Sequence, residues 1–304
     1  MYFLIYGFLK LVSLLPVRIL YLIADFVFVL LYYVIRYRKN IVRSNLAIAF
    51  PEKTAAEREQ IMKRFYKNLT DTFLEMIKML TWSEAEVRKR FKGNIEVINQ
   101  WAGKERNVQV VTGHFFNWEL ANLSVSSQCA LPFLGVYMPL TNKVMNKIFY
   151  DLRKRFGTIL IPATDFKKNV KDYFKNQSAL ILVADQNPGV PGRAWWMHFF
   201  SKPAPFITGP AKGAIARNTV VIYANYFKIK RGYYQVVFEE ITPSPSEFTE
   251  GALTYLLAKK VESSIKERPD NYLWTHRRWK HQWKPEYQDN WIDATKPCPE
   301  SINA

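Results

Sequence analysis

The sequence predicts an α/β fold, a mixed sheet flanked by helices, behind an apolar helical segment at the N-terminus. From about residue 93, short apolar runs alternate with amphipathic segments, which is typical of strands and helices packed in layers. Two of these runs flank a turn at residues 230–232, which predicts an antiparallel hairpin within the sheet. Hydrophobic residues make up 49% of the 304 residues, so the chain can bury a sizeable core.

The N-terminal segment is strongly apolar. Residues 19–35 carry one charge, Asp25, and a basic cluster follows directly at residues 36–43. At 1.5 Å per residue this stretch spans about 25 Å of helix, slightly less than a hydrocarbon core of about 30 Å. A signal peptide would need a basic n-region and a cleavage site, while a buried core helix stays open as an alternative. We expect residues 1–36 to be a helical membrane anchor that spans the bilayer or lies in its interface, with the remaining chain on the cytoplasmic side.

The rest of the chain reads as alternating elements. Residues 55–80 place apolar side chains at helical spacing, which predicts a core-facing helix. Strands are expected at residues 108–112, 132–137, 158–161, 179–183, 220–227 and 233–239. Further helices are expected at residues 117–128, 142–156, 165–176, 205–217 and 249–266. Because the sequence has no internal repeat or visible linker, we expect one domain over residues 37–285 and a C-terminal tail over residues 286–304.

The charge balance limits the classes of partner. The 43 Lys and Arg residues exceed the 26 Asp and Glu residues by 17, which implies nucleic acid, anionic lipid or an acidic protein. No recognised nucleic-acid-binding module is present, and nucleic-acid binding would leave the apolar N-terminus unexplained. The two cysteines, Cys129 and Cys298, lack metal-type spacing. We therefore predict no metal, no cofactor and a reducing compartment.

The segment VQVVTGHFFNWEL at residues 108–120 holds the strongest candidates for chemistry. An expected strand runs into His114, and Glu119 follows at the start of an expected helix. A carboxylate at this distance can fix the proton on one ring nitrogen, so that the other nitrogen becomes a general base for a hydroxyl. A structural histidine at the strand end is the alternative.

Four further blocks follow in order. They are NKIFYDLRKRFG with the strand LIP after it (residues 146–162), ADQN (184–187), a phenylalanine pair before a small-residue helix (199–217) and YLWTHRRWK (272–280). Together with VVTGHFFNWEL, which is similar to an H-x-x-x-x-(D/E) motif, these blocks resemble the late acyltransferases of lipid A biosynthesis, the lauroyl/myristoyl transferase family. The resemblance covers residue 1 to about residue 285.

The resemblance implies a glycerolipid-acyltransferase-like fold and a membrane-anchored O-acyltransferase at the cell inner membrane. The acyl donor would be a thioester of acyl carrier protein, and the acceptor would be a hydroxyl of a phosphorylated glycolipid, a lipid A precursor. His114 would deprotonate this hydroxyl and Glu119 would orient His114. The helix arginine that stabilises the tetrahedral intermediate matches Arg153, with Arg155 as the alternative.

The resemblance leaves other roles open. Asp185 and Gln186, just past an expected strand, either contact the substrate or shape the pocket. Arg277 and Arg278 either bind phosphates of the acceptor or belong to a structural cluster at the membrane interface. The acceptor could instead be an aminolipid or a lysolipid, and a catalytically inactive lipid-binding module is the alternative of a different class. Acyl chain length depends on pocket shape, which the motifs do not encode.

Overall fold

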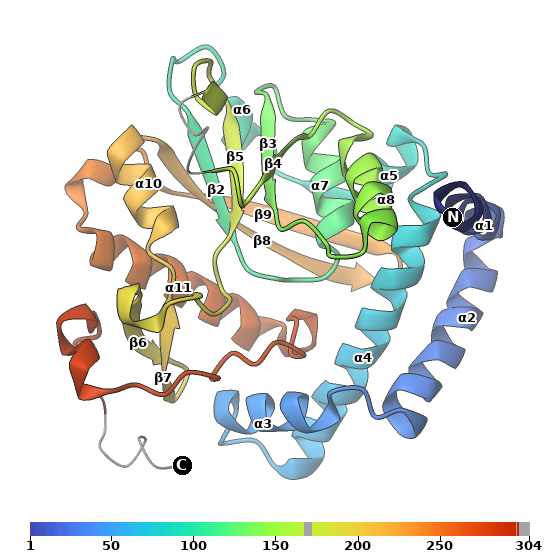
Figure 1. Ribbon diagram of the computed structural model, residues 1–304, viewed down its shortest axis with the longest axis horizontal. Coiled ribbons are helices and arrows are strands. Elements are labelled where there is room, and N and C mark those ends of the chain that lie inside the picture. Colours follow the sequence, from blue (N-terminus) through green and yellow to red (C-terminus); the bar gives the residue numbers. More distant parts are fainter. Residues whose placement is uncertain (167–171, 296, 298–304) are drawn as a thin grey trace.

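The computed structural model describes residues 1–166, 172–295 and 297, and Figure 1 shows its architecture. Within these residues the main sheet has seven strands in the order β1-β9-β8-β2-β5-β3-β4. All pairings are parallel except that of β8 with β9, and helices cover both faces of the sheet. The predicted fold class is therefore confirmed. The strands are β1 (Phe91–Gly93), β2 (Val108–Thr112), β3 (Phe133–Tyr137), β4 (Ile159–Pro162), β5 (Ala179–Val183), β8 (Val220–Lys230) and β9 (Tyr233–Thr242).

The pairing of β2 with β5 determines where the site lies. Thr112, the last residue of β2, is in register with Val183, the last residue of β5. All of β2 is buried, including its polar residues Gln109 and Thr112, as expected for a central parallel strand covered on both faces. Because the two strands run in the same direction and end together, the residues that follow them leave the sheet side by side. Ligand-binding residues of α/β sheets gather at this carboxyl edge.

Helices pack on the two faces according to the alternation of strand side chains. On one face lie α7 (Trp118–Ser126) and α8 (Lys143–Lys154), and on the other lie α10 (Gly209–Arg217) and α11 (Glu250–Glu267) (Figure 1). Val110 belongs to the apolar cluster that contains Leu120 of α7, whereas Val111 packs in a cluster with Ala211 and Leu257. Successive strand residues point to opposite faces, so both faces of β2 are covered.

The N-terminal helices flank the sheet domain. The apolar segment forms α1 (Tyr2–Leu14), α2 (Val17–Val29) and a π-helical turn η1 (Leu30–Val34), and Figure 1 shows α2 running beside α4 (Ala55–Lys78). Leu20 and Ala24 of α2 pack with Leu74 of α4 in a small buried cluster. Val17–Val34 is long and apolar enough to cross a membrane, and core helices of soluble proteins and signal sequences can have the same length and composition. Short helices complete this part of the fold: α3 (Lys39–Ala49), α5 (Glu84–Arg90) and α6 (Glu96–Asn99).

One predicted helix differs from the structure. The segment at residues 205–217 becomes helical only at Gly209, because Lys202–Phe206 forms strand β7, paired antiparallel with β6 (Trp195–Phe199). Prolines at positions 203 and 205 remove backbone donors, which is tolerated in an edge strand but not in a helix interior. The helix expected at residues 165–176 includes positions 167–171, which lie outside the described residues.

The segment expected as a tail packs on the β6–β7 hairpin. A short helix, η5 (Pro285–Asn290), leads to Trp291, which forms a bridge with Trp196 of β6. The backbone N–H of Ile292 donates to the carbonyl of Trp196 at 2.9 Å. Residues up to 295 thus contact the domain. The remaining short helices are η2 (Pro191–Arg193), η3 (Pro245–Glu247) and η4 (Pro269–Asn271).

Candidate active site

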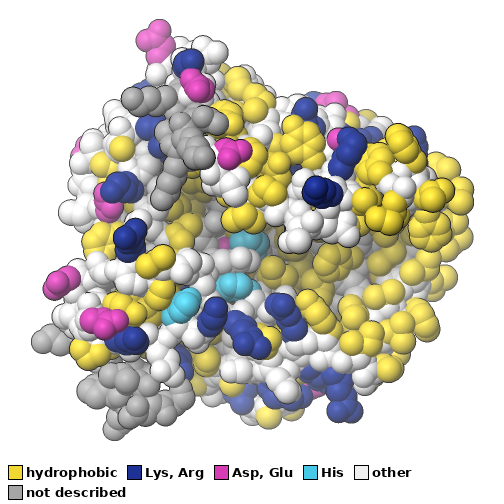
Figure 2. Space-filling view, in the orientation of Figure 1, with side chains coloured by type: hydrophobic (Ala, Val, Ile, Leu, Met, Phe, Trp, Pro, Cys, Tyr) yellow, Lys and Arg dark blue, Asp and Glu magenta, His cyan; other side chains and the backbone are white. Residues whose placement is uncertain are grey.

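A pocket of about 710 Å³ lies at the carboxyl edge of the sheet. Strands β2, β3 and β5 and helices α7, α8 and α10 supply most of its lining, which includes His114 and Arg153. This volume is within the range of small-molecule sites, and apolar side chains dominate the lining. In Figure 2 the face is hollowed near its centre, and histidine side chains lie at the hollow.

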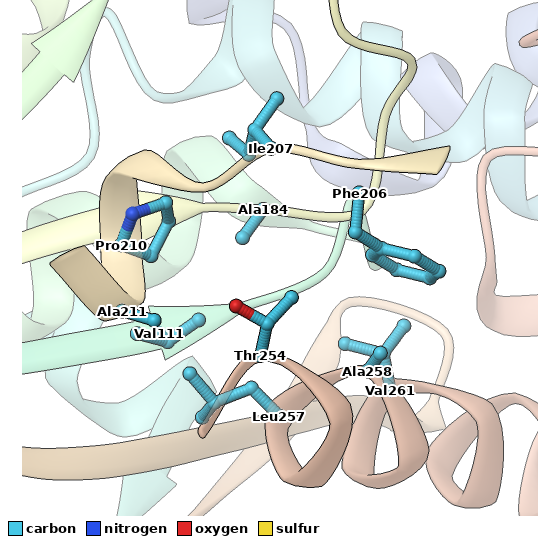
Figure 3. A pocket seen from close by; sticks show the side chains of 10 residues that line it. All are labelled: Val111, Ala184, Phe206, Ile207, Pro210, Ala211, Thr254, Leu257, Ala258 and Val261. Atoms are coloured by element: carbon cyan, nitrogen blue, oxygen red, sulfur yellow. The ribbon is translucent and has the colours of Figure 1, made fainter. Parts of the chain in front are cut away.

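A second cavity carries no chemistry. Figure 3 shows it between β2, α10 and α11, lined by apolar side chains such as Val111 and Leu257 together with Thr254. Its volume of about 20 Å³ holds roughly one water molecule. The hydroxyl of Thr254 already donates to the carbonyl of Glu250 at 2.7 Å. We therefore assign this cavity to imperfect packing.

His114 is paired with Asp185. Nδ1 of His114 lies 2.7 Å from Oδ1 of Asp185, and the same oxygen accepts the backbone N–H of His114 at 3.1 Å. Each residue follows its strand by two positions, so the register of Thr112 with Val183 brings them together. An ionised carboxylate can only accept, so Nδ1 carries the proton and Nε2 keeps its lone pair. The His114 side chain is 27% exposed, whereas that of Asp185 is 1% exposed.

The electrostatics keep Asp185 ionised. Burial alone would raise the pKa of the Asp185 carboxyl, but the charge and hydrogen bonds of His114 outweigh this effect, and the pKa lies below its ordinary value. Burial, reinforced by the charge of Asp185, raises the pKa of the neighbouring Tyr272 phenol well above its ordinary value. A buried carboxylate of this kind holds the histidine tautomer and stabilises the imidazolium that forms when Nε2 takes a proton.

The predicted pairing of Glu119 with His114 is wrong. Glu119 is bound to Arg153 by three contacts of 2.5 to 3.0 Å, and its Oε1 also accepts from the indole of Trp118 at 3.1 Å. Glu119 lies in the first turn of α7 and is 2% exposed, so its charge needs a close cation. Burial opposes the charge of Arg153, but Glu119 outweighs it and keeps the pKa of Arg153 above its ordinary value.

The structure separates the two candidate arginines of α8. Arg153 lines the pocket, and Glu119 engages its Nε and Nη2, which leaves Nη1 without a bond to that carboxylate. Arg155 instead donates to the carbonyls of Met79 and Trp82 at the end of α4. Arg153 is therefore the candidate for contact with a substrate, and Arg155 is a structural residue.

The segment after η4 forms backbone hydrogen bonds with the loop that carries His114. The backbone N–H of Leu273 donates to the carbonyl of His114 at 3.0 Å, and that of Phe116 donates to the carbonyl of Asn271 at 3.0 Å. A Cβ atom at Gly113 would lie 3.0 Å from the ring of Phe115, so a side chain there would displace the loop. The geometry of the loop thus depends on residues more than 150 positions away.

A buried carboxylate holds the start of α7. Oε2 of Glu75 on α4 accepts from the amide of Asn117 at 3.0 Å and from the hydroxyl of Tyr234 at 2.7 Å. The side-chain oxygen of Asn117 in turn caps α7 by accepting the N–H of Leu120. Burial raises the pKa of Glu75. Sequence reasoning missed this group because Glu75 belongs to an ordinary amphipathic helix pattern.

The basic signature near the C-terminus has two different parts. Arg278 is fully buried, donates to Oδ1 of Asn187 at 3.1 Å and to the carbonyl of Pro205 at 2.9 Å, and lies 4.3 Å from the ring centroid of Phe206. Burial lowers its pKa to about 10. These contacts with protein groups favour the structural alternative for Arg278 over binding of acceptor phosphates. Arg277 is exposed.

Gln186 is the remaining residue that the sequence singles out. Gln186 is half-buried next to Asp185, and neither residue lines the pocket, so Asp185 belongs to the candidate site only through its contact with His114. Among the described residues, no group of three or more His, Cys, Asp or Glu side chains is placed to hold a metal ion.

The chain is similar to known proteins along most of its length. A family model described as bacterial lipid A biosynthesis acyltransferase matches residues 1–281. Over 250 residues the chain is 26% identical to lipid A biosynthesis palmitoleoyltransferase of Escherichia coli (strain K12), covering 80% of this chain and 79% of the relative. It is 23% identical over 248 residues to lipid A biosynthesis lauroyltransferase of the same organism, with coverage of 80% and 79%. A lipid A biosynthesis acyltransferase of Haemophilus influenzae is 24% identical over 250 residues, with coverage of 80% and 78%.

Proposed function

Because the chain belongs to the bacterial lipid A biosynthesis acyltransferase family and is an acyltransferase, we propose that it transfers a fatty acyl chain from an acyl thioester to a hydroxyl of a phosphorylated lipid A precursor. The observation that carries this proposal is the His114–Asp185 pair beside an apolar pocket. The pair supplies a general base, and the pocket has room for the reacting part of a lipid substrate.

In the proposed reaction Nε2 of His114 takes the proton of the acceptor hydroxyl. The hydroxyl oxygen attacks the thioester carbonyl carbon, and the tetrahedral intermediate collapses with cleavage of the carbon–sulfur bond. The imidazolium returns its proton to the departing thiolate, so the products are an ester and a thiol. Asp185 stabilises the imidazolium, because its charge lies 2.7 Å from Nδ1. This route needs no covalent intermediate on the enzyme.

Arg153 is the proposed partner of the developing oxyanion. Its Nη1 is not bound by Glu119, and the side chain lines the same pocket as His114. A preorganised cation costs no reorganisation when negative charge develops on the carbonyl oxygen. Glu119 then acts as a positioning residue that holds the guanidinium plane, in place of the role in orienting His114.

The apolar side of the pocket is the proposed site of the acyl chain. Gly135 and Ile181 line it from adjacent strands, and Ala121 of α7 and Leu160 of β4 complete this wall. Small side chains at two of these positions leave the space open. A glycine inside a strand often marks a close approach of a ligand.

The exposed face of the N-terminal helices supports attachment to a membrane. Phe3, Phe8 and Phe26 each expose more than 60% of their surface. The other face of α2 is held by protein, because Arg231 binds both Asp25 of α2 and Asp71 of α4 at 2.6 to 3.0 Å. If α2 crossed the bilayer, this ion network would lie near its centre, which is costly. We therefore propose that α1 and α2 lie in the membrane interface.

The proposed location is the cytoplasmic face of the inner membrane, since basic residues follow the apolar segment directly. The proposed donor is acyl carrier protein. A net charge of +17 favours association with a small acidic protein, and it favours an anionic leaflet for the same reason.

Transfer with purified protein tests the proposal. The full chain in neutral detergent is given acyl carrier protein thioester and a phosphorylated lipid A precursor, and mass spectrometry measures the gain of one acyl chain on the acceptor. An aminolipid and a lysolipid serve as competing acceptors, and coenzyme A thioester as the competing donor. Acylation of another lipid with none on the precursor would overturn the acceptor assignment. Transfer to no lipid would support the inactive lipid-binding module.

A further inference from the structure

Four exposed cations lie at the contact of Arg38 with Thr275 or within five residues of it along the chain, and none of them has a carboxylate partner among the described residues. They are Arg36, Arg38, Arg277 and Lys280, here called the rim cluster. By contrast, the neighbouring Lys39 forms an ion pair with Glu59 at 3.3 Å. In Figure 2, Lys and Arg side chains adjoin the histidine side chains at the central hollow. The rim cluster therefore has charge that the protein itself does not neutralise.

A short backbone segment joins the rim cluster to the active site. Nη1 of Arg38 donates to the carbonyl of Thr275 at 3.1 Å, while Leu273, two residues earlier, donates to the carbonyl of His114. From the N–H of Leu273 to the carbonyl of Thr275 the segment has three residues, which span at most about 11 Å. The Arg38 guanidinium and the His114 backbone therefore contact the two ends of one short segment, a separation that a single lipid headgroup can bridge.

The electrostatic surroundings of His276 also indicate that Arg38 lies close to this segment. Burial, followed by the positive charge of Arg278 and a smaller contribution from that of Arg38, lowers the pKa of His276 to about 4. Its ring is therefore neutral near pH 7, and its Nδ1 is buried without a hydrogen-bond partner among the described residues. The Arg38 guanidinium of the rim cluster thus lies close enough to the His276 imidazole to act on it, and His276 belongs to the segment that binds the His114 loop.

The backbone at the rim cluster is strained. Arg36 and Arg38 have φ values of 53° and 51°, in the left-handed region that favours glycine and, among other residues, asparagine. Strained positions of this kind cluster at ligand sites. Directly before them, Val34 and Ile35 are exposed apolar residues, so the change from apolar to cationic surface occurs at one point of the chain. A lipid with its headgroup at the membrane surface has the same boundary.

We propose that Arg36, Arg38 and Arg277 bind a phosphate group of the acceptor lipid while its hydroxyl lies at His114. Guanidinium groups suit this role because they bind phosphate through two parallel hydrogen bonds. This proposal rests on the proposed function and adds a recognition site for the acceptor, made in part by the loop between the apolar helices and α3.

The test removes charge without adding strain. The double variant Arg36→Asn with Arg277→Gln is suited to it, because asparagine tolerates the left-handed backbone and neither side chain has a hydrogen bond or ion pair among the described residues. The matched control is Lys89→Gln with Lys104→Gln, two exposed cations of which Lys104 precedes β2 and lies toward the opposite edge of the sheet. The substrates are the phosphorylated acceptor and its dephosphorylated form, in neutral detergent micelles with the donor fixed.

We expect the acceptor KM of the rim variant to rise at least tenfold for the phosphorylated acceptor, so that the preference of the wild type for phosphate is lost. The control variant should keep that preference. An equal rise for both acceptors would overturn the proposal, since it would mean a structural role. The proposal would also be overturned if the rim variant kept the acceptor KM of the wild type in micelles but floated less well with phosphatidylglycerol vesicles. The rim cluster would then bind bulk anionic lipid. Absence of transfer by the wild type to either acceptor would instead refute the proposed function.

Discussion

Asp185 binds His114 twice, through the ring nitrogen Nδ1 at 2.7 Å and through the backbone N–H at 3.1 Å, with one carboxylate oxygen. The double contact fixes both the rotation of the ring and the position of the main chain that carries it. A side chain held in this way leaves only Nε2 for exchange of a proton with substrate.

Asp185→Asn should lower kcat by about 10³ to 10⁴-fold, because the amide keeps the shape but favours the wrong tautomer and cannot stabilise the imidazolium. The matched control is Asp293→Asn. Oδ2 of Asp293 lies 3.2 Å from Nδ1 of His198, and neither residue lines the pocket. The control should keep near-wild-type kcat. Steady-state transfer rates measure both, and activity of Asp185→Asn within tenfold of wild type would contradict the assigned role.

Glu119→Gln should destabilise the protein by about 3 kcal/mol, because the charge of Arg153 is left without its buried partner. It should also lower kcat by about 10²-fold through a misplaced oxyanion donor. Combining Arg153→Gln with Glu119→Gln should lower stability and kcat little further, as expected for residues that act as a unit. The control is Arg155→Gln at the C-cap of α8, which should change thermal stability but not kcat. Fully additive losses in the double variant would argue against the pairing.

Arg278→Gln should lower stability by about 2–4 kcal/mol while leaving the ratio of KM values for phosphorylated and dephosphorylated acceptors at its wild-type value. The physical reason is burial: the variant leaves Oδ1 of Asn187 and the carbonyl of Pro205 without their donor. Denaturant unfolding and transfer kinetics together check this outcome. A selective loss of phosphate preference would show that Arg278 reaches the substrate.

His276 predicts a specific dependence of stability on pH. Its folded pKa of about 4 is below the unfolded value of about 6.5, so between these values the unfolded state binds more protons. The free energy of unfolding should therefore fall as the pH drops from 6.5 to 4.5, by roughly 2–3 kcal/mol from this residue. His276→Gln should remove that part of the fall. Identical pH profiles for the variant and the wild type would show that the ring is not buried as described.

Phe8→Gln with Phe26→Gln should reduce flotation with liposomes at least tenfold without loss of thermal stability, because both side chains face outward from α1 and α2. The control variant, Ile159→Gln with Val237→Gln, removes exposed apolar surface from β4 and β9 and should float like the wild type. Unchanged flotation of the phenylalanine variant would place the membrane contact elsewhere.

The elements of the sheet were predictable from sequence because their signals are local. The segments Val108–Thr112 and Ala179–Val183 are short apolar runs, and both agree with the structure to the residue. Residues 117 and 249, where helices were expected to begin, are the N-caps of α7 and α11. The β6–β7 hairpin was not predicted, since the prolines and the small residue of β7 resemble a helix start more than a strand.

The residues brought together at the candidate site could be singled out from the sequence, but their pairing could not. His114, Glu119, Arg153 and Asp185 were all identified, yet a linear motif suggested that His114 and Glu119 interact. The true partner of His114 lies 71 positions away, and the contact depends on β5 being the sheet neighbour of β2. Strand adjacency is set by long-range packing, which one sequence does not reveal. Likewise, the burial of Arg278 follows from its position behind β7, a strand that was not expected.

The register of β2 with β5 has a consequence for how members of this family can change in length. Thr112 and Val183 end their strands together, and His114 and Asp185 each follow by the same two-residue offset. Insertions or deletions in the long connection between the strands leave that offset intact. One extra residue after either strand end would shift one partner by roughly 3.3 Å relative to the other, more than a hydrogen bond can absorb. Length variation should therefore be widespread between the two strands and absent at the two short junctions.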